Sequence, residues 1–435
     1  MIRQKIETYE QAVEYVCMLP RFSKIATFSD TQAFLKKLGN PHKNMKIIHV
    51  AGTNGKGSVC AYLCSVLKAA GYTYSLFTSP HLADIRERFV INGRMITKQE
   101  FLEAFLSIYD MIEWNQSEKQ EMYHPTFFEY LFFMAMTLFT KANTDYCVLE
   151  TGLGGRLDAT NSISHKEISV ITHMGLDHTE YLGDTLGKIA WEKAGIMHTG
   201  AKAVYWETDE EVTRVLSEYA KILDISAFSV SKRDYTFLNF SNKTIDFSYL
   251  SLYYDSVRLR LNTIARYQME NASLALRTLE VLLGKEKITP QVMQIGIQSA
   301  YWAGRMEEIM PNVYLDGAHN EDGIRAFLET VSQDGCQLPR KLLFGVVQDK
   351  AYDAMIQAIV LSGLFTNISV VQIKSVRAVN VENLEKAFKQ YLGKDIPFYH
   401  SVNEAFLAET GTSLKDERLY IAGSLYLVGE IKELL

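Results

Sequence analysis

The chain has 435 residues, 47% of which are hydrophobic, and a formal net charge of −6 at pH 7. A chain of this length predicts two or three domains, and its hydrophobic content argues against wholesale disorder. Because the protein is acidic as a whole, it has no global positive field to hold nucleic acid, and that class of partner is disfavoured. Its five cysteines form no CxxC pair and no disulfide framework, a pattern typical of a reducing cytosol.

The sequence also argues against membrane association. Its first residues carry no apolar signal core. The most apolar stretch, residues 126–140, contains Glu129 and is too short to cross a bilayer, so we expect a buried helix there. We therefore expect a cytoplasmic protein with no membrane partner.

The first half of the chain alternates strand-like and helix-like patterns. We expect strands at residues 46–50, 74–78, 146–150 and 168–172, with a helix after the first strand that stops at Gly71. Each strand is followed by polar or glycine-rich residues. In an open parallel sheet, ligands bind beyond the carboxyl ends of the strands, so these four strand ends predict one shared site.

The second half contains a further alternating series. Residues 201–261 are less regular and β-rich, and we interpret them as an antiparallel edge or an insertion. From residue 312 onward, four strand-like runs alternate with helical patterns, which predicts a separate α/β domain of about 130 residues. We place the boundary so that the domains span residues 1–300 and 301–435.

Residues 49–58, HVAGTNGKGS, carry the most chemical information. A strand, a glycine-rich turn and a helix in this order present backbone N–H groups to a phosphate. Lys56 adds a positive charge for the β- and γ-phosphates, and Ser58 offers a hydroxyl for Mg²⁺. The segment departs from the usual P-loop twice, because Val50 stands where a glycine is expected and Gly57 separates the lysine from the serine. A tight turn without a ligand is the alternative, and phosphate binding is the favoured interpretation.

Other strand ends supply candidate metal ligands. Glu150 closes a predicted strand, where its carboxylate could bind Mg²⁺ beside a phosphate, although it could also be a charged strand end. His178 follows another strand, and Lys193 lies in a helical pattern; alone, the histidine would be a packing residue and the lysine a solvated one. The glycines after Glu150 resemble a dinucleotide-binding turn only weakly, because position 157 lacks the third glycine.

The region around the predicted boundary adds residues that could contact a nucleotide. Arg305 lies at the junction, and Asp316 ends the first strand expected in the second domain, where it could reach a ribose or a phosphate. Gln268 and Asn271 lie in a helical pattern just before the boundary and could contact a base.

In chain order, these segments resemble the folylpolyglutamate synthase / dihydrofolate synthase family of the Mur ligase superfamily. The resemblance covers nearly the whole chain and rests on the motifs GTNGKGS, TSPHL, RERFVING, PTFFE, LETGLGGRLDATN, GLDHTEYLG, EKAGI, WAGRMEE, DGAHN and IAGSLYLVGE. It implies an α/β protein with an N-terminal P-loop-type ATP-binding domain, built on a mostly parallel sheet, and a smaller C-terminal Rossmann-like domain. It also implies an ATP-dependent ligase that adds L-glutamate to a folate through an acyl phosphate, in a cleft between the two domains.

The resemblance further implies ligands and residue roles, with ATP and two Mg²⁺ ions as cofactors. Lys193 would be carbamylated, which turns its amine into a carboxylate-like group. The implied catalytic residues are Lys56, Glu150, His178 and Lys193. The implied ATP-binding residues are Gly52, Thr53, Asn54, Gly55, Lys56, Gly57, Ser58, Asn271, Arg305, Asp316 and His319. The implied metal ligands are Ser79, Glu150, His178 and Lys193, and the implied folate-binding residues are Thr126, Phe127, Phe128, Glu129, Leu157, Asp158 and Ala159.

The sequence departs from the family pattern at three positions and leaves the substrate open. Ala303 and Glu321 stand where the family commonly has proline, and Tyr267 where it often has histidine. Reduced folate, dihydropteroate or both could be the substrate, so dihydrofolate synthase and a bifunctional enzyme are alternatives. A cell-wall amino-acid ligase fits the folate-type motifs less well, and a non-catalytic nucleotide-binding protein would have lost metal residues that are all present here. We expect a monomer.

Overall fold

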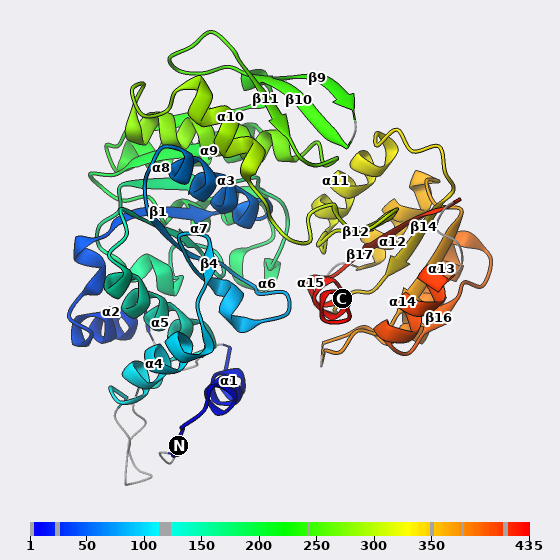
Figure 1. Ribbon diagram of the computed structural model, residues 1–435, viewed down its shortest axis with the longest axis horizontal. Helices are drawn as coiled ribbons and strands as arrows, with labels where there is room; N and C mark the ends of the chain where they lie inside the picture. The colour runs from blue at the N-terminus through cyan, green and yellow to red at the C-terminus, as the bar shows by residue number, and fades with distance from the viewer. Residues whose placement is uncertain are drawn as a thin grey trace.

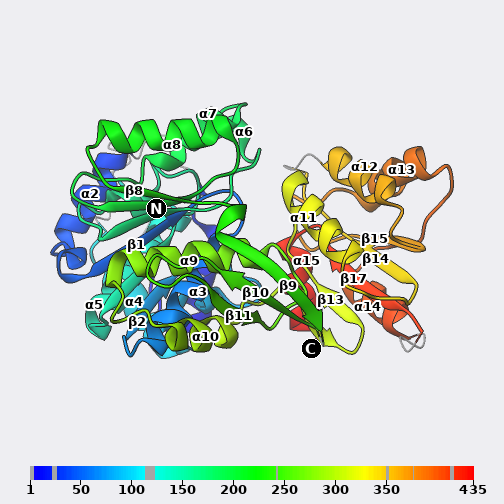
Figure 2. The ribbon, with the colours of Figure 1, turned by 90° about the horizontal axis from the view of Figure 1, so that it is seen from above.

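Three β-sheets organise the computed structural model, which describes residues 4–21, 27–112, 123–241, 243–348, 352–375, 377–411 and 416–435. An eight-stranded and a three-stranded sheet belong to the N-terminal part, which runs from α1 to α10. A six-stranded sheet belongs to the C-terminal part, which runs from β12 to α15. The two parts lie side by side in Figures 1 and 2, with α6 and α11 on their facing sides.

The eight-stranded sheet has the strand order β4-β3-β2-β5-β1-β6-β7-β8 and is parallel except for β3 and β4. The four strands expected from the sequence are its central neighbours, which confirms that their carboxyl ends meet at one edge. At this edge Val50 pairs with Glu150 on one side and with Val170 on the other. The strands are β1 (Lys46–Ala51), β2 (Tyr74–Phe77), β3 (Phe89–Ile91), β4 (Arg94–Met95), β5 (Tyr146–Glu150), β6 (Ile168–Ile171), β7 (Lys202–Trp206) and β8 (Ala227–Val230).

Helices cover both faces of this sheet because its strands are apolar on both sides. One face packs against α3 and α9, and the other against α5, α7 and α8. The apolar stretch expected to form a buried helix is α5, whose residues 130–136 are all buried. The helices are α1 (Tyr9–Met18), α2 (Phe28–Lys37), α3 (Lys56–Ala69), α4 (Lys98–Tyr109), α5 (Phe127–Ala142), α6 (Thr179–Leu182), α7 (Leu186–Ala194), α8 (Glu210–Ile222), α9 (Gln268–Leu283) and α10 (Pro290–Ser299). In the described ranges, no helix combines the length and apolar character needed to cross a membrane.

The interpretation of residues 201–261 was only partly right. Residues 202–230 form a β7–α8–β8 unit that extends the parallel sheet, so they are not an antiparallel edge. The short edge strand β8 is only half-buried, which makes its apolar pattern weak. Residues 235–261 do form antiparallel strands, but in a separate sheet of order β11-β10-β9. These strands are β9 (Tyr235–Ser241), β10 (Thr244–Tyr249) and β11 (Val257–Leu261).

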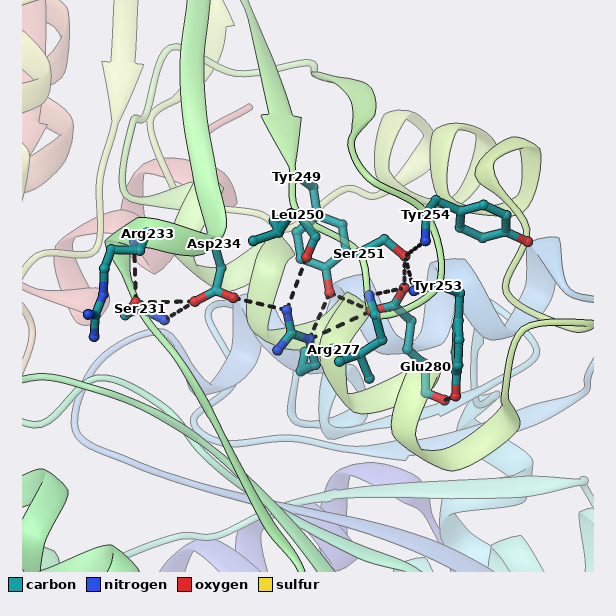
Figure 3. A network of polar contacts seen from close by, with 11 residues as sticks. Ser231, Arg233, Asp234, Tyr249, Leu250, Ser251, Tyr253, Tyr254, Arg277 and Glu280 are labelled. Atoms are coloured by element: carbon teal, nitrogen blue, oxygen red, sulfur yellow. Dashed lines mark hydrogen bonds and ion pairs between the residues drawn. The ribbon is translucent and has the colours of Figure 1, made fainter.

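A buried polar network fastens the three-stranded sheet to α9 (Figure 3). The fully buried carboxylate of Glu280 accepts hydrogen bonds from the hydroxyls of Tyr249 and Ser251. Arg277 donates to the Tyr249 hydroxyl at 3.2 Å and to the Asp234 carboxylate at 2.9 Å. Because each charge in this network has a partner, its burial is compensated, and the network fixes the position of α9 relative to the sheet.

The six-stranded sheet has the order β12-β13-β17-β14-β15-β16, with β12 antiparallel to β13 and the other pairs parallel. The sequence suggested that Asp316 follows the first strand of this sheet. It follows the second strand, β13, because the short strand β12 comes before β13 in the chain. The strands are β12 (Glu307–Met310), β13 (Val313–Leu315), β14 (Arg340–Phe344), β15 (Asn367–Val371), β16 (Phe398–Tyr399) and β17 (Arg418–Ala422). The helices are α11 (Glu321–Ser332), α12 (Tyr352–Ser362), α13 (Val381–Leu392), α14 (Val402–Gly411) and α15 (Leu425–Glu433).

Candidate functional site

The glycine-rich loop joins the central strand β1 to α3. Gly52 and Gly55 have positive φ angles of 152° and 87°, and neither position has space for a side chain. A Cβ atom at Gly52 would lie 1.8 Å from Thr172 Oγ1, and one at Gly55 would lie 2.3 Å from Asn271 Oδ1. Glycine is therefore required at both positions for steric reasons.

The loop is also bonded to the chain segment after β6. The backbone N–H groups of Thr53 and Asn54 donate to the carbonyl of His173, at 2.9 and 3.2 Å. These two amides are thus occupied by the protein, and the amides at the N-terminus of α3 are the ones available to an anion. Both departures from the usual P-loop have structural causes. Val50 is a buried strand residue, and a Cβ at Gly57 would lie 2.9 Å from the ring of Trp302.

Two lysines converge on one carbonyl of this loop. The Nζ atoms of Lys56 and Lys193 donate to the carbonyl of Gly52, at 3.1 and 2.7 Å. Lys193 comes from α7 and is buried. Burial and the nearby charge of Lys56 lower the pKa of Lys193 to about 7, against the opposing effect of Asp177 and Asp158. Lys193 is therefore not the solvated helix residue that its sequence context alone suggested.

Glu150 and Ser79 meet beside the loop. The buried Glu150 carboxylate accepts a hydrogen bond from the Ser79 N–H at 3.0 Å. Burial raises the pKa of Glu150, and the positive charge of Lys56 acts in the opposite direction. His178 is the N-cap residue of the short helix α6, and its side chain is 41% exposed, with Nε2 3.9 Å from Asp177 Oδ1.

The donor set decides how far this site fits a metal. Mg²⁺ prefers oxygen ligands and shares them with phosphate oxygens, so the Glu150 carboxylate and the hydroxyl of its neighbour Ser79 are donors of the right type for one such ion. The Lys193 amine cannot bind a cation unless it is converted to a carbamate. Among the described residues, no group of three or more His, Cys, Asp or Glu side chains is arranged to hold a metal by itself.

A cavity of about 280 Å³ opens between the N-terminus of α3, the start of α9 and the chain that leads to β12. Ser58, Gln268, Trp302 and Arg305 lie among its lining residues. Gln268 donates from Nε2 to the Ser58 hydroxyl at 3.1 Å, and its Oε1 accepts from Asn271 at 3.0 Å. A cavity with polar side chains next to a phosphate loop has the character of a nucleotide pocket.

Asp316 contacts Met306, one of the residues that line this cavity, and its carboxylate is largely occupied by protein donors. Its Oδ2 accepts from the Tyr267 hydroxyl at 2.8 Å and from the Met306 N–H at 2.9 Å, and its Oδ1 accepts from the Ala318 N–H at 2.8 Å. Burial raises the pKa of Asp316, opposed by the charge of Arg305. Tyr267, one of the departures from the family pattern, is thus a direct partner of this carboxylate.

The Arg305 and His319 side chains lie close to the same turn. The Arg305 guanidinium donates to the carbonyl of Gly304 at 3.1 Å, and a Cβ at Gly317 would lie 2.0 Å from its Nη1. His319 Nδ1 is 2.7 Å from the carbonyl of Gly317. The structure therefore brings Arg305, Asp316 and His319 together around one turn of the C-terminal part.

The residues expected to bind folate fall into two groups. The polar residues of this set form hydrogen bonds within the protein. Thr126 and Glu129 form the capping box of α5. The Asp158 carboxylate accepts hydrogen bonds from the N–H groups of Gly152 and Leu153, at 2.9 and 2.8 Å. Burial raises the pKa of Asp158, against these hydrogen bonds.

The second group is apolar and more accessible. The Phe128 ring lies against Gly152, where a Cβ would be 2.7 Å from the ring, and Phe127 lies 5.3 Å below the Arg88 guanidinium. Leu157 is 63% exposed, whereas Ala159 is buried. The ring of a bound ligand could therefore contact the two phenylalanines and Leu157.

Arg88 and His81 were not singled out from the sequence, although both lie in motifs that carry the resemblance. Arg88 is buried and donates from Nε to His81 Nδ1 at 2.8 Å. Burial lowers the pKa of Arg88 to about 10, opposed by the charge of Glu150. A buried cation near the strand ends is suited to an anionic ligand. Arg88 could not be singled out from the sequence, because an arginine in a short motif is not expected to be buried.

Fold and site together define a nucleotide-binding α/β protein of the Mur ligase class, with a phosphate loop that faces a second α/β unit. Residues 50–279 match the Mur ligase middle domain. The dihydrofolate synthase/folylpolyglutamate synthase of Bacillus subtilis is 32% identical over 369 residues, with 80% of this chain and 82% of the relative covered. The folylpolyglutamate synthase of Lacticaseibacillus casei is 29% identical, with 98% of both chains covered. The chain belongs to the folylpolyglutamate synthase / dihydrofolate synthase family of ATP-dependent, Mur ligase-type enzymes.

Solved structures agree with this assignment and confirm the expected fold class. The folylpolyglutamate synthase of Thermotoga maritima superposes with a TM-score of 0.82 at 28% identity, with 98% of this chain and 96% of that chain covered. The Mycobacterium tuberculosis folylpolyglutamate synthase, crystallised with ADP and AMPPCP, superposes with a TM-score of 0.85 at 26% identity and covers 98% of each chain.

Proposed function

We propose that this protein uses ATP to join the amine of L-glutamate to a carboxylate of a folate. The observation that carries the proposal is the convergence of Lys56, Lys193 and Glu150 on the phosphate loop of a chain from this family. The ADP and AMPPCP complexes of the M. tuberculosis relative support ATP as the nucleotide.

The reaction needs two steps because a carboxylate is a poor electrophile. In the first step, a carboxylate oxygen of the folate attacks the γ-phosphorus of ATP, the bond to the β-phosphate oxygen breaks, and ADP leaves. In the second step, the glutamate amine attacks the acyl carbon, phosphate leaves with the bonding electron pair, and the amine loses a proton. Phosphoryl transfer depends mainly on alignment and charge neutralisation, which Lys56 and the N-terminal amides of α3 would provide.

Glu150 and Ser79 would hold one Mg²⁺, and His178 with carbamylated Lys193 would hold a second. When bound, the metal supplies positive charge that neutralises phosphate oxygens and orients them. Two features of the protein would add to this effect. Lys56 would neutralise negative charge on the phosphates, and the buried environment of Glu150 would keep water away from the reacting groups.

Three of the residues assigned to ATP, Gly52, Gly55 and Gly57, would allow the backbone of the loop to take its conformation. Thr53 and Asn54 would hold the loop in place through their hydrogen bonds. Ser58 and Asn271 would border the nucleotide, whose ribose would lie near the remaining three, Arg305, Asp316 and His319.

The folate would lie across the loop that follows β5. Phe127, Phe128 and Leu157 would contact its ring system, while Thr126, Glu129, Asp158 and Ala159 would shape the wall behind it. Arg88 would meet a substrate carboxylate, because it is a buried cation above the ring of Phe127. We further propose domains of residues 1–300 and 301–435, a monomer, and a cytoplasmic location.

Dihydrofolate synthase is the second candidate activity, since the B. subtilis relative is named for both reactions. An ADP-release assay with L-glutamate, run in parallel with dihydropteroate and with tetrahydrofolate, separates the two. ADP release that requires both glutamate and one of the pterin substrates supports a ligase. ADP release that depends on neither substrate would indicate an ATPase, and no ADP release with both pterins would favour a non-catalytic nucleotide-binding protein. Either result would contradict the proposed function.

A further inference from the structure

Asn320 lies where the C-terminal part meets the phosphate loop. It follows the turn of Asp316 and His319 and is the N-cap residue of α11, with Oδ1 accepting a hydrogen bond from the Gly323 N–H at 2.8 Å. Only 4% of the residue is exposed. A buried side-chain amide needs partners for both of its N–H donors as well as for its oxygen.

The donors of Asn320 find these partners in the N-terminal part. Its Nδ2 donates to Asn54 Oδ1 at 3.0 Å and to Asp177 Oδ2 at 3.1 Å. Asn54 returns a hydrogen bond from Nδ2 to Asn320 Oδ1 at 3.2 Å. One side chain of the C-terminal part thus bonds to the phosphate loop and to the residue before His178.

Asn54 is itself held tightly. Its N–H donates to the carbonyl of His173 at 3.2 Å, and its carbonyl accepts from Thr172 Oγ1 at 2.7 Å. A shift of Asn320 would therefore act on the loop through a rigid partner. Separation of the two parts would break the reciprocal amide pair and leave both amides to be hydrated.

We propose that Asn320 is a positioning residue that couples the docking of the C-terminal part to the geometry of the phosphate loop. The inference rests on the proposed function. With Asn320 in place, the cleft is closed when the acyl phosphate is present. Without its two donors, the cleft is looser and water can attack the acyl phosphate, which returns the folate carboxylate and releases inorganic phosphate, so that ATP is consumed without amide formation.

Asn320→Asp is the variant that isolates this role. Aspartate is as good an N-cap as asparagine, so the hydrogen bond from Gly323 is kept. The two donated hydrogen bonds are lost, and a carboxylate oxygen faces the acceptor oxygens of Asn54 and Asp177. Asn380→Asp is the matched control, because Asn380 caps α13 in the same C-terminal part through the Glu382 N–H.

The readout is the ratio of phosphate released to amide formed, measured with saturating ATP, pterin substrate and L-glutamate. We expect a ratio of about 1 for wild type and Asn380→Asp, and a ratio on the order of 3 or more for Asn320→Asp, with amide turnover reduced roughly 10-fold. A merely structural defect would lower both products together. Asn320→Ser also caps α11 but is too short to keep the contacts with Asn54 and Asp177, so it should show the same excess of phosphate if Asn320→Asp misfolds.

Wild-type ratios in both Asn320 variants, with amide turnover unchanged or reduced, would overturn the role of Asn320 and leave the proposed ligase intact. If wild type itself forms no amide with either pterin, the proposed function fails and the inference fails with it.

Discussion

Lys193→Met tests the most unusual group in the site. The Lys193 amine is buried in α7, donates to the carbonyl of Gly52 and lies near the charge of Lys56, which together with burial lowers its pKa from 10.5 to about 7. Carbamylation requires the neutral amine: its nitrogen adds to the carbon of CO₂ and releases one proton. At pH 7, roughly half of an amine with this pKa is neutral, compared with roughly 1 in 3,000 for an ordinary lysine. The site therefore raises the reactive fraction by a factor on the order of 10³.

The assay is ¹³C NMR of the protein in ¹³C-bicarbonate, together with ligase turnover as a function of pH. We expect a carbamate signal in wild type that is absent in Lys193→Met, and turnover that rises with pH through about 7 as the protonated amine disappears. Lys188→Met is the control, because Lys188 lies on the same helix but is exposed and paired with Asp184 at 2.8 Å. Acetate or bicarbonate added to Lys193→Ala should restore part of the activity. A Lys193→Met enzyme with wild-type turnover and an unchanged ¹³C spectrum would show that Lys193 is neither carbamylated nor required for ligation.

In the absence of CO₂, the lowered pKa of Lys193 also determines how the free energy of unfolding changes with pH. The folded-state pKa lies below the unfolded one, so the unfolded chain binds more protons between about pH 7 and 10.5. The contribution of Lys193 to the free energy of unfolding is therefore unfavourable below pH 7 and recovers as the pH rises to 10.5. Lys193→Met should flatten this rise in urea titrations, whereas an identical slope in both proteins would contradict the lowered pKa.

Three further predictions concern the loop and the packing around it. Lys56→Ala should leave thermal unfolding nearly unchanged and reduce ATP-dependent ligation by a factor on the order of 10² or more, and turnover close to wild type would count against the loop assignment. Glu280→Ala should destabilise by about 2–4 kcal/mol in urea unfolding, because the hydroxyls of Tyr249 and Ser251 lose their buried acceptor and Arg277 keeps only the Asp234 carboxylate, whereas the exposed Glu286→Ala should change stability by less than about 0.5 kcal/mol. Burial raises the pKa of Glu270 to about 7, so its contribution to stability is complete below about pH 4.5 and is lost as the pH rises through 7; in Glu270→Gln this decline should be absent, and its persistence would show that another group causes it.

The architecture of the N-terminal part could be predicted because its strands are continuous apolar runs. The four strands with polar carboxyl ends are the four central neighbours of the sheet, and the glycine-rich turn joins a strand to a helix, as its sequence suggested. The β7–α8–β8 unit was missed, since a four-residue edge strand that is half-buried leaves little apolar periodicity.

The site could be predicted from the sequence only where the residue types of a motif indicate a reaction partner, as the glycine-rich turn with Lys56 indicates a phosphate. The position of Lys193 depends on how α7 packs against the loop, and no local pattern shows that its amine reaches the Gly52 carbonyl. The resemblance implies that Asp158 contacts the folate, and no local pattern shows that its carboxylate also accepts hydrogen bonds from the N–H groups of Gly152 and Leu153. Asn320 lies in the DGAHN motif but was assigned no role of its own, because its contacts are with residues more than a hundred positions away.

In the proposed reaction, ATP activates a folate carboxylate. The most direct test uses a pterin substrate in which both oxygens of the reacting carboxylate are ¹⁸O, with mass spectrometry of the inorganic phosphate released as the amide forms. An acyl phosphate transfers one carboxylate oxygen to phosphorus, so we predict one ¹⁸O in each phosphate released with an amide bond. Amide formation with unlabelled phosphate, or with the label in AMP, would exclude the acyl phosphate.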